Sequence, residues 1–313
     1  MHIETLKIFC DVVENQSFSL AASHNFITQS AVSQQIRGLE ERYGKRLLER
    51  KRGSVRPTAA GEILHRASRE ILQQFEEMEA QLQGLSNVVT GSIRVGTVHS
   101  VGLYELSEPL KAYFADFPNV NVYLEYDRSS HVYEQVLRGN VDLGIVAYPT
   151  ARAQLTVLDF RSDRLVVACA PNHPLAERTE IPVTAINGEK FVGFEKGIPT
   201  RQALDRVFAE RHVTVQYVAE LDNIEMVKRL VEVNAGIAVI PEKSCAHEVR
   251  AGTIVKVELS DKDLTRPIGI IYRTGKHFSP AVERFIEYLQ ADPATVRTQQ
   301  QRAASVRRST LRA

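Results

Sequence analysis

The stretch that decides the fold of the N-terminal region is residues 17–44, SFSLAASHNFITQSAVSQQIRGLEERYG. Ser17 is suited to cap a short helix, and a longer helix begins near Thr28. Gly44 stops the segment that follows the apolar residues of that helix. Apolar residues at helical spacing between positions 6 and 13 predict one more helix before this stretch. The region therefore reads as three helices separated by tight turns.

The helix that begins near Thr28 has two faces of different chemistry. Because a helix turns by about 100° per residue, Val32, Ile36 and Leu39 fall on one side, where the preceding helices can cover them. The opposite side is polar and ends in an arginine; it carries Ser30, Ser33, Gln34 and Arg37. Serine and glutamine can bond to base edges, and arginine pairs with guanine or phosphate. A merely solvated face would more often carry Glu and Lys, so this face favours contact with DNA.

The whole-chain net charge of +1 hides a strongly basic segment. Between positions 37 and 56, eight basic residues stand against three acidic ones, which leaves a local charge of +5. A DNA backbone responds to such a local patch rather than to the total charge. Alone, the patch is equally compatible with a solvated surface; beside the polar helix face it favours DNA.

Residues 47–58, LLERKRGSVRPT, predict a two-stranded wing that turns at Gly53 and Ser54. A long helix follows, with Thr58 as its expected cap. Along it, residues at alternating spacings of four and three form a seam typical of a coiled-coil dimer. The seam consists of Leu64, Ser68, Ile71, Phe75, Met78, Leu82 and Leu85. The alternative is a helix packed on its own domain. Turn residues at 87–92 predict a hinge.

From residue 93 the chain alternates between strand-like and helix-like runs. This alternation predicts βαβ units, largely parallel sheets and two small α/β lobes. The expected strands are IRVGT at 93, VNVYLEY at 120, VDLGIVA at 141, RLVVACA at 164, KFVGF at 190, GIAVIP at 236 and PIGIIY at 267. The expected helices begin near Leu103, Ser130, Thr200, Asn223 and Ser279.

Other classes of function find little support. No apolar run reaches the roughly 18–20 residues of a membrane span, and the start of the chain lacks the apolar core of a secretory signal, so we expect a cytoplasmic protein. The three cysteines are far apart and read as buried thiols rather than disulfides or zinc ligands. Phosphate-binding, dinucleotide-binding and zinc-protease motifs are absent from the sequence, and nine histidines are scattered singly. We therefore expect no enzyme activity, no cofactor and no metal.

The N-terminal residues resemble the winged helix-turn-helix of the LysR-type transcriptional regulators. Leu48 departs from the phenylalanine usual before the wing but keeps its apolar character. The matching residues are Leu6, Phe9, Val12, Ser17, Phe18, Ala21, Ala22, Gln29, Ser30, Ala31, Val32, Ser33, Ile36, Leu39, Glu40, Gly44, Leu47, Arg50, Arg52, Thr58 and Gly61. The later half resembles the effector domain of the same family, which is built like a periplasmic solute-binding protein. Its local matches are VDLGI at 141, NHPL at 172 and GIAVIP at 236.

The resemblance implies an α+β multidomain fold. A winged helix-turn-helix DNA-binding domain occupies residues 1–58, and a linker and dimerisation helix with its hinge occupies 59–90. A two-lobed α/β effector domain, like a periplasmic binding protein, occupies 91–290, with lobe 1 at about 91–162 and 266–290 and lobe 2 at about 163–265. Residues 291–313 contain five arginines and read as a basic disordered tail, with weak auxiliary DNA affinity as the alternative.

For DNA, the resemblance implies a homodimer joined through the long helix and commonly assembled into a homotetramer. Its recognition helices enter successive major grooves of an interrupted palindrome in double-stranded operator DNA. The candidates for contact with bases are Gln29, Ser30, Ser33, Gln34 and Arg37, and those for the wing on phosphate or minor groove are Arg50, Arg52 and Arg56. Ser30 or Thr28 could instead cap the helix. RNA polymerase is a further partner if the protein is an activator; activator and repressor use the same parts.

For the effector, ligand groups in such clefts come from loops after strands and from helix N-termini, whose free N–H groups favour anions. We therefore expect a small anionic metabolite, although the sequence names neither the effector nor the operator. The candidate residues are His99, Ser100, Val101, Gly102, Ser129, Ser130, Ala147, Tyr148, Thr200, Arg201, Asn223 and Ile224. Hydroxyls at helix starts are also ordinary caps, and Arg201 could be a surface ion-pair residue. A stand-alone solute receptor would explain residues 91–290 but not the helix-turn-helix, and it would need an export signal.

Overall fold

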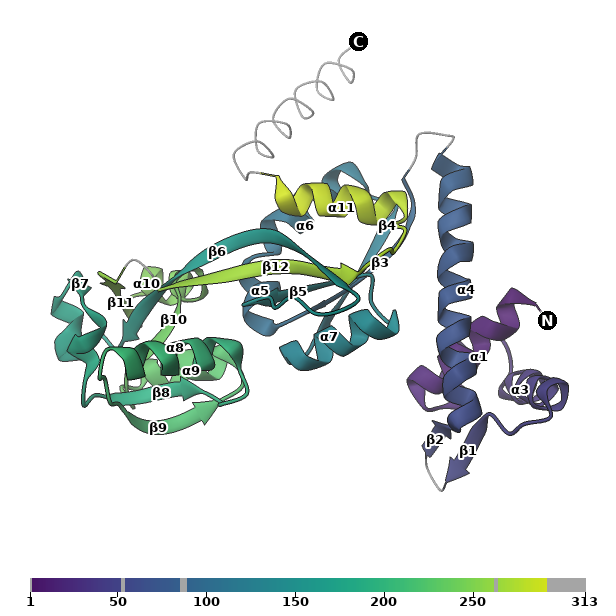
Figure 1. Cartoon of the computed structure of the whole chain (residues 1–313), viewed down its shortest axis with the longest axis horizontal. Helices are drawn as coiled ribbons and strands as arrows, with labels where there is room; N and C mark the ends of the chain where they lie inside the picture. Colours follow the sequence, from purple (N-terminus) through teal and green to yellow (C-terminus); the bar gives the residue numbers. More distant parts are fainter. Residues whose placement is uncertain (1, 52–53, 85–88, 262–263, 292–313) are drawn as a thin grey trace, which may run out of the picture. The chain divides into compact units, whose positions relative to one another are not determined.

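The computed structural model describes residues 2–51, 54–84, 89–261 and 264–291 (Figure 1). The chain divides into two compact units. One contains residues 1–91 with the short segments Arg138–Asn140 and Phe278–Pro280, and the other contains the rest. The predicted hinge at 87–92 lies partly outside the described residues, and the basic tail after residue 291 lies wholly outside them.

The N-terminal unit is a winged helix-turn-helix followed by a long helix. Ser17 caps the second helix by accepting the backbone N–H of Leu20. Thr28 caps the third by accepting the N–H of Ala31, so Thr28 rather than Ser30 is the cap there. The elements are α1 (Ile3–Asn15), α2 (Phe18–His24), α3 (Gln29–Tyr43), β1 (Leu48–Lys51), β2 (Ser54–Pro57) and α4 (Ala59–Gly84). The fold class expected for this region is thus confirmed.

The core of this unit forms where α1, α2 and α3 meet. The apolar side of α3 is fully covered, because Val32, Ile36 and Leu39 share one cluster with residues of α1 and α2. Leu47 and Leu48, at the start of the antiparallel hairpin, close the same cluster. Packing therefore uses one face of α3 and leaves the other free.

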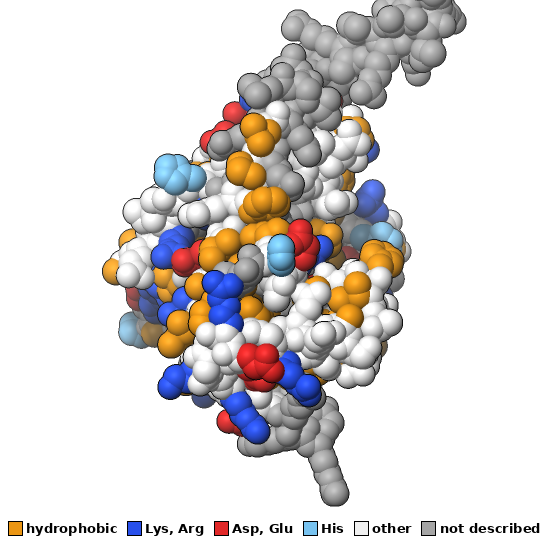
Figure 2. Space-filling model, turned by 90° about the vertical axis from the view of Figure 1, so that its right-hand side faces the viewer, with side chains coloured by type: hydrophobic (Ala, Val, Ile, Leu, Met, Phe, Trp, Pro, Cys, Tyr) orange, Lys and Arg blue, Asp and Glu red, His pale blue; other side chains and the backbone are white. Residues whose placement is uncertain are grey.

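The long helix α4 changes its surroundings along its length. Near its start, Leu64 packs against the helix-turn-helix core, so this part of the seam is covered by its own unit. Ser68, the next position of the seam, is fully buried. Further along, Ile71, Met78 and Leu82 are exposed, and hydrophobic side chains form a band along α4 in Figure 2. Leu85 lies outside the described residues. Both sequence interpretations of the seam therefore find support, each over a different part of the helix.

The second unit contains two α/β lobes that share two long strands (Figure 1). Its main sheet has the order β4-β3-β5-β12-β6-β11-β7, β10 pairs with β6, and β8 and β9 form a small sheet. Lobe 1 contains β3 (Gly91–Thr97), α5 (His99–Tyr104), α6 (Ser107–Asp116), β4 (Val120–Tyr126), α7 (Ser129–Arg138), β5 (Leu143–Ala147) and α11 (Pro280–Gln290). Lobe 2 contains η1 (Pro174–Glu177), β7 (Glu180–Ile181), η2 (Val183–Ile186), β8 (Lys190–Phe194), α8 (Pro199–Glu210), β9 (Gln216–Leu221), α9 (Ile224–Glu232), β10 (Ala238–Pro241), η3 (Glu242–Cys245), α10 (Ala246–Ala251) and β11 (Val255–Leu259).

The shared strands are β6 (Leu155–Cys169) and β12 (Thr265–Arg273). The first part of β6 pairs antiparallel with β12, and its last part pairs antiparallel with β10 and β11. The prediction of largely parallel sheets is therefore wrong for the centre of this unit. The chain enters lobe 2 along β6 and returns along the neighbouring β12, so these two strands must run in opposite directions. Parallel pairing occurs at β3–β5, β8–β9 and β7–β11.

One glycine of α4 has no room for a side chain. A Cβ built on Gly61 would lie 2.1 Å from the carbonyl oxygen of Leu47, whereas a Cβ on Gly38 of α3 would meet nothing within 4 Å. Both glycines are helical. Since a backbone oxygen cannot move aside as a flexible side chain can, Gly61 allows α4 to lie against the start of the wing.

We predict that Gly61→Ala destabilises the N-terminal unit by about 1–3 kcal/mol, which is the usual cost of overpacking. The matched variant Gly38→Ala should instead stabilise it by about 0.5–1 kcal/mol, because alanine is the better helix former. Denaturant unfolding of both variants measures the two changes. Equal stabilities for both variants would show that the close approach at Leu47 is not a constraint.

Candidate functional site

The polar face of α3 is the first candidate site. Gln29, Ser30, Gln34 and Arg37 are exposed, and Ser33 is half-buried. The side chain of Gln29 donates weakly to the Ser33 hydroxyl, at 3.5 Å. All five predicted contact residues thus lie on the part of α3 that the core does not use.

Basic side chains surround this face. Arg42, Lys45 and Arg46, at and after the end of α3, are exposed, and so is Arg56 on β2. On the side of the molecule that Figure 2 shows, Lys and Arg side chains gather toward the lower end. Of the other predicted wing residues, Arg50 lies on β1 and Arg52 lies outside the described residues. The surface offers hydrogen-bonding groups on a helix and positive charge around it.

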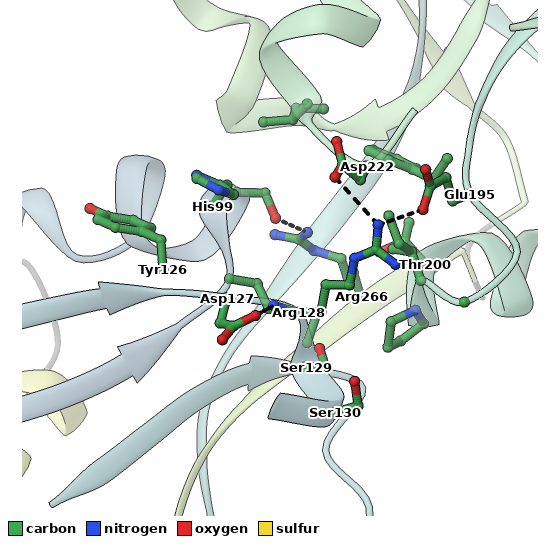
Figure 3. Close-up of a pocket in the computed structure, with 18 residues that line it drawn as sticks. His99, Tyr126, Asp127, Arg128, Ser129, Ser130, Glu195, Thr200, Asp222 and Arg266 are labelled. Carbon is green, nitrogen blue, oxygen red and sulfur yellow. Dashed lines mark hydrogen bonds and ion pairs between the residues drawn. The ribbon is translucent and has the colours of Figure 1, made fainter. Parts of the chain in front are cut away.

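The second candidate site is a cavity between the lobes of the C-terminal unit (Figure 3). Its volume is about 340 Å³, which suits a small metabolite. It is lined by Val98, His99, Ser100, Tyr126, Asp127, Arg128, Ser129, Ser130 and Ala147 of lobe 1, by Phe194, Glu195, Gly197, Ile198, Pro199, Thr200, Asp222 and Ile224 of lobe 2, and by Arg266 of β12.

Seven of the twelve predicted effector residues line this cavity: His99, Ser100, Ser129, Ser130, Ala147, Thr200 and Ile224. The other five lie elsewhere. Val101 is fully buried, and a Cβ on Gly102 would lie 2.4 Å from the Tyr126 ring, so both belong to packing beneath α5. Asn223 caps α9 by accepting the N–H of Glu225. Tyr148 takes a left-handed backbone conformation and lines a smaller, separate hollow.

Arg201 is the fifth, and its guanidinium is occupied within lobe 2. It donates to Asp205 at 2.7 Å and to Glu220 at 2.6 Å, and it bonds to the carbonyl oxygen of Phe194. The group also lies 3.8 Å from the centre of the Tyr217 ring. These contacts fit the alternative role of Arg201, that of an ion-pair residue, better than a role in effector binding. The side chain is buried, however, and not at the surface.

Arg266 is a cavity residue that sequence reasoning missed. Only 2% of it is exposed, and it donates twice to one carboxylate oxygen of Asp163, at 3.1 and 2.6 Å. A third N–H reaches the hydroxyl of Ser100 at 2.8 Å. A guanidinium has five N–H groups, so these three bonds do not exhaust its donors. The residues form this triad because Arg266 and Asp163 are cross-strand partners on β12 and β6.

Arg128, also missed, lines the cavity and joins the two lobes. It comes from lobe 1 just before α7, and its guanidinium lies 2.9 Å from Glu195 and 3.5 Å from Asp222 of lobe 2 (Figure 3). The side chains of all three residues are exposed, so these ion pairs are weak and easily exchanged.

Thr200 presents a hydroxyl to the cavity. The residue as a whole is 3% exposed, and within the described residues its hydroxyl makes no hydrogen bond. The position is therefore suited to a ligand that supplies the missing hydrogen bond.

Other site chemistries find no support in the described part of the chain. Within it, no group of three or more His, Cys, Asp and Glu side chains could hold a metal ion. Cys10, Cys169 and Cys245 are buried thiols, as expected. No helix among these residues is long and apolar enough to cross a membrane.

A winged helix-turn-helix joined to a two-lobed α/β domain is the architecture of a bacterial transcription regulator. A family model described as the bacterial regulatory helix-turn-helix protein of the lysR family matches residues 3–62, and one described as the LysR substrate binding domain matches residues 86–294. This chain belongs to the LysR family of transcriptional regulators.

Three relatives illustrate the match. The RuBisCO operon transcriptional regulator of Allochromatium vinosum is 30% identical over 297 residues, which cover 94% of this chain and 98% of that protein. The structure of full-length CbnR with its target DNA has a TM-score of 0.67 at 19% identity and covers 92% of this chain and 99% of that one. The CcmR regulatory domain of Synechocystis PCC6803 in complex with 2-PG has a TM-score of 0.59 at 25% identity and covers 64% of this chain and 96% of that one.

We predict that Arg266→Met destabilises the C-terminal unit by about 3–5 kcal/mol, because it leaves the buried Asp163 carboxylate without its partner. The neighbouring Arg164→Met should cost at most about 1 kcal/mol, since Arg164 is exposed and pairs with Glu258 at the surface. Urea unfolding followed by circular dichroism compares the two. A similar small loss for both would contradict the role given to the buried pair.

Proposed function

We propose that this LysR-family regulator binds duplex operator DNA through α3 and the wing, and that a small anionic effector in the cleft between the lobes controls that binding or the activation of transcription. The observation that carries the proposal is the cleft itself. It brings together the buried guanidinium of Arg266 and the unpartnered hydroxyl of Thr200, in a chain whose α3 exposes a polar face.

DNA binding is supported by the difference between the buried and the exposed face of α3. Its apolar residues are fully used in the core, so the face with Gln34 and Arg37 has no structural task. A helix presented in this way fits the major groove, where amide and guanidinium groups read base edges. The basic residues around it would hold phosphates.

An anionic effector is supported by the groups that converge on the cleft. The starts of α7 and α8 lie at the cavity with Ser129 and Thr200, and free N–H groups at helix starts favour anions. Arg266 adds a positive charge, and Arg128 can exchange its weak contacts with acidic side chains for an anion. The related CcmR domain was solved with 2-PG. From the groups that converge on the cleft, we infer an effector that is small and negatively charged.

Assembly follows from the exposed part of α4. Ile71, Met78 and Leu82 suit a dimer seam, which would place two α3 helices on successive major grooves. We propose further that two dimers pair into a tetramer and that the protein is cytoplasmic. If it is an activator, it would also contact RNA polymerase. The chain would act as a regulator and not as an enzyme.

The effector can act only through a difference in its affinity for two arrangements of the assembly. Because both lobes contribute to the cavity, occupancy favours one packing of the lobes. We propose that this packing sets the relative placement of the DNA-binding domains, and with it the bend in the DNA.

For DNA binding, we predict that Arg37→Ala weakens operator affinity by about 1–3 kcal/mol, the usual contribution of a base-contacting arginine. Its secondary structure should not change, because Arg37 is exposed. Fluorescence anisotropy at moderate salt measures the affinity. The control is Arg178→Ala, which also removes one positive charge but at an exposed position of lobe 2. Undiminished affinity of the Arg37 variant would rule out the assignment.

For the effector, we predict that Thr200→Val weakens binding by about 0.5–1.5 kcal/mol, the net contribution of one hydrogen bond. Folding stability should hardly change, since the hydroxyl lies at the cavity and makes no hydrogen bond to the described residues. Calorimetry with a panel of organic and inorganic anions measures binding, and the exposed Thr179→Val is the control. If no anion binds the unmodified protein, the proposed class of effector is wrong.

A further inference from the structure

A cluster of polar side chains joins the two lobes outside the cavity. Tyr104, the last residue of α5 in lobe 1, extends to lobe 2, where its ring packs against the core around α9. Its hydroxyl donates to Glu225 and accepts from the ammonium of Lys228, which lies 2.8 Å away. Burial, above all, raises the pKa of Tyr104 to about 12, so the hydroxyl keeps the proton that it donates.

Lys228 is the buried centre of this cluster. Only 4% of its side chain is exposed. Its ammonium donates to the Tyr104 hydroxyl, to the carbonyl oxygen of Ser244 at 2.9 Å and to a carboxylate oxygen of Glu248 at 2.8 Å, and it also pairs with a carboxylate oxygen of Glu225 at 3.1 Å. If the lobes moved apart at this point, the Tyr104 hydroxyl would lose both of its partners, Glu225 and Lys228, and the buried ammonium would lose one of its neighbours, which is unfavourable.

A second contact between the lobes lies beside it. Glu105, the residue after Tyr104, accepts from Lys243 of η3 at 2.7 Å, and its side chain is 1% exposed. The end of α5 is therefore held to lobe 2 by two successive residues. Together with the covalent connections β6 and β12, these contacts limit how the lobes can be placed (Figure 1).

The same two helices begin at the cleft. α5 starts with the cavity residues His99 and Ser100, and α9 starts with Ile224, directly after Asp222 and Asn223. Since α5 has six residues at about 1.5 Å each, Tyr104 lies about one and a half turns from the cavity. A ligand that contacts both helix starts would thus act on the pair of helices that Tyr104 joins.

We propose that Tyr104 is a positioning residue that, through Lys228 and Glu225, determines how the two lobes are placed around the cleft. It does not line the cavity. Its link to regulation rests on the proposed effector function, whereas its effect on lobe placement does not.

The test measures lobe placement in the full-length protein without any effector. Spin labels are attached at Asn121→Cys on β4 of lobe 1 and at Asn172→Cys in lobe 2, both exposed positions; the three native cysteines are buried. Labelled chains are mixed with excess unlabelled chains, so that distances within one chain dominate. Double electron–electron resonance should give one narrow distance distribution for the parent. Tyr104→Phe, which keeps the ring but loses the hydroxyl, should broaden and shift it.

Two further variants make the result decisive. Tyr123→Phe removes the hydroxyl of an exposed tyrosine on β4 and should leave the distribution unchanged. Glu225→Ala removes the half-exposed acceptor of the Tyr104 hydroxyl and should shift the distribution in the same direction as Tyr104→Phe, by a smaller amount. Parent-like distributions for both Tyr104→Phe and Glu225→Ala would overturn the inference, even if both lowered the unfolding temperature.

This outcome is separable from that of the effector experiment. The distances are recorded with no ligand present, so an unchanged distribution refutes the positioning role and leaves the cleft available as an effector site. Conversely, a failure of anions to bind the cleft would refute the proposed effector, while a shifted distribution would still support the role of Tyr104 in lobe placement.

Discussion

The antiparallel pairing of β6 with β12 is the constraint on which the effector half depends. These strands belong to both lobes, so their backbone hydrogen bonds fix the two places where the chain passes between lobes. Asp163 and Arg266 are direct cross-strand partners in this pairing. Their buried ion pair turns one guanidinium edge toward Ser100 and the cavity. The sheet that connects the lobes thereby also places the positive charge of the cleft.

In the N-terminal unit the corresponding constraint is the complete burial of one side of α3. Because Val32, Ile36 and Leu39 are used in the core, the rotation of the helix about its axis is set, and Gln34 and Arg37 must face outward. The short distance between Gly61 and Leu47 then sets α4 against the wing. Folding and DNA recognition use different faces of one helix.

Much of the N-terminal half follows from the sequence, because its signals are local. The cap at Thr28 and the glycine after α3 are short-range features, and the apolar spacing identifies the buried face. The first part of β6 was harder to predict. Its residues are mostly only partly buried and include charged side chains such as Asp159 and Arg161, so they lack the apolar run that marked the rest of the strand.

The candidate cleft could be predicted only where its residues follow the general rule that ligands meet helix starts. Ser129 and Thr200 obey it. Arg266 does not, since it lies on a strand far along the chain and reaches the cavity only through its pairing with β6. Arg201 satisfied the rule but is bound by Asp205 and Glu220, which are four and nineteen positions away. Whether an arginine pairs with a carboxylate in the folded protein depends on tertiary contacts, and the spacing of residues in the sequence does not show these.

The central claim is that occupancy of the cleft changes how the protein holds its operator. The most direct measurement is a footprint of the full-length protein on the DNA upstream of its own gene, recorded with and without an anion that a thermal-shift screen has shown to bind. The account predicts that the ligand moves the boundary of the protected region or changes the sites of enhanced cleavage that mark the bend. An identical footprint at saturating ligand would contradict it.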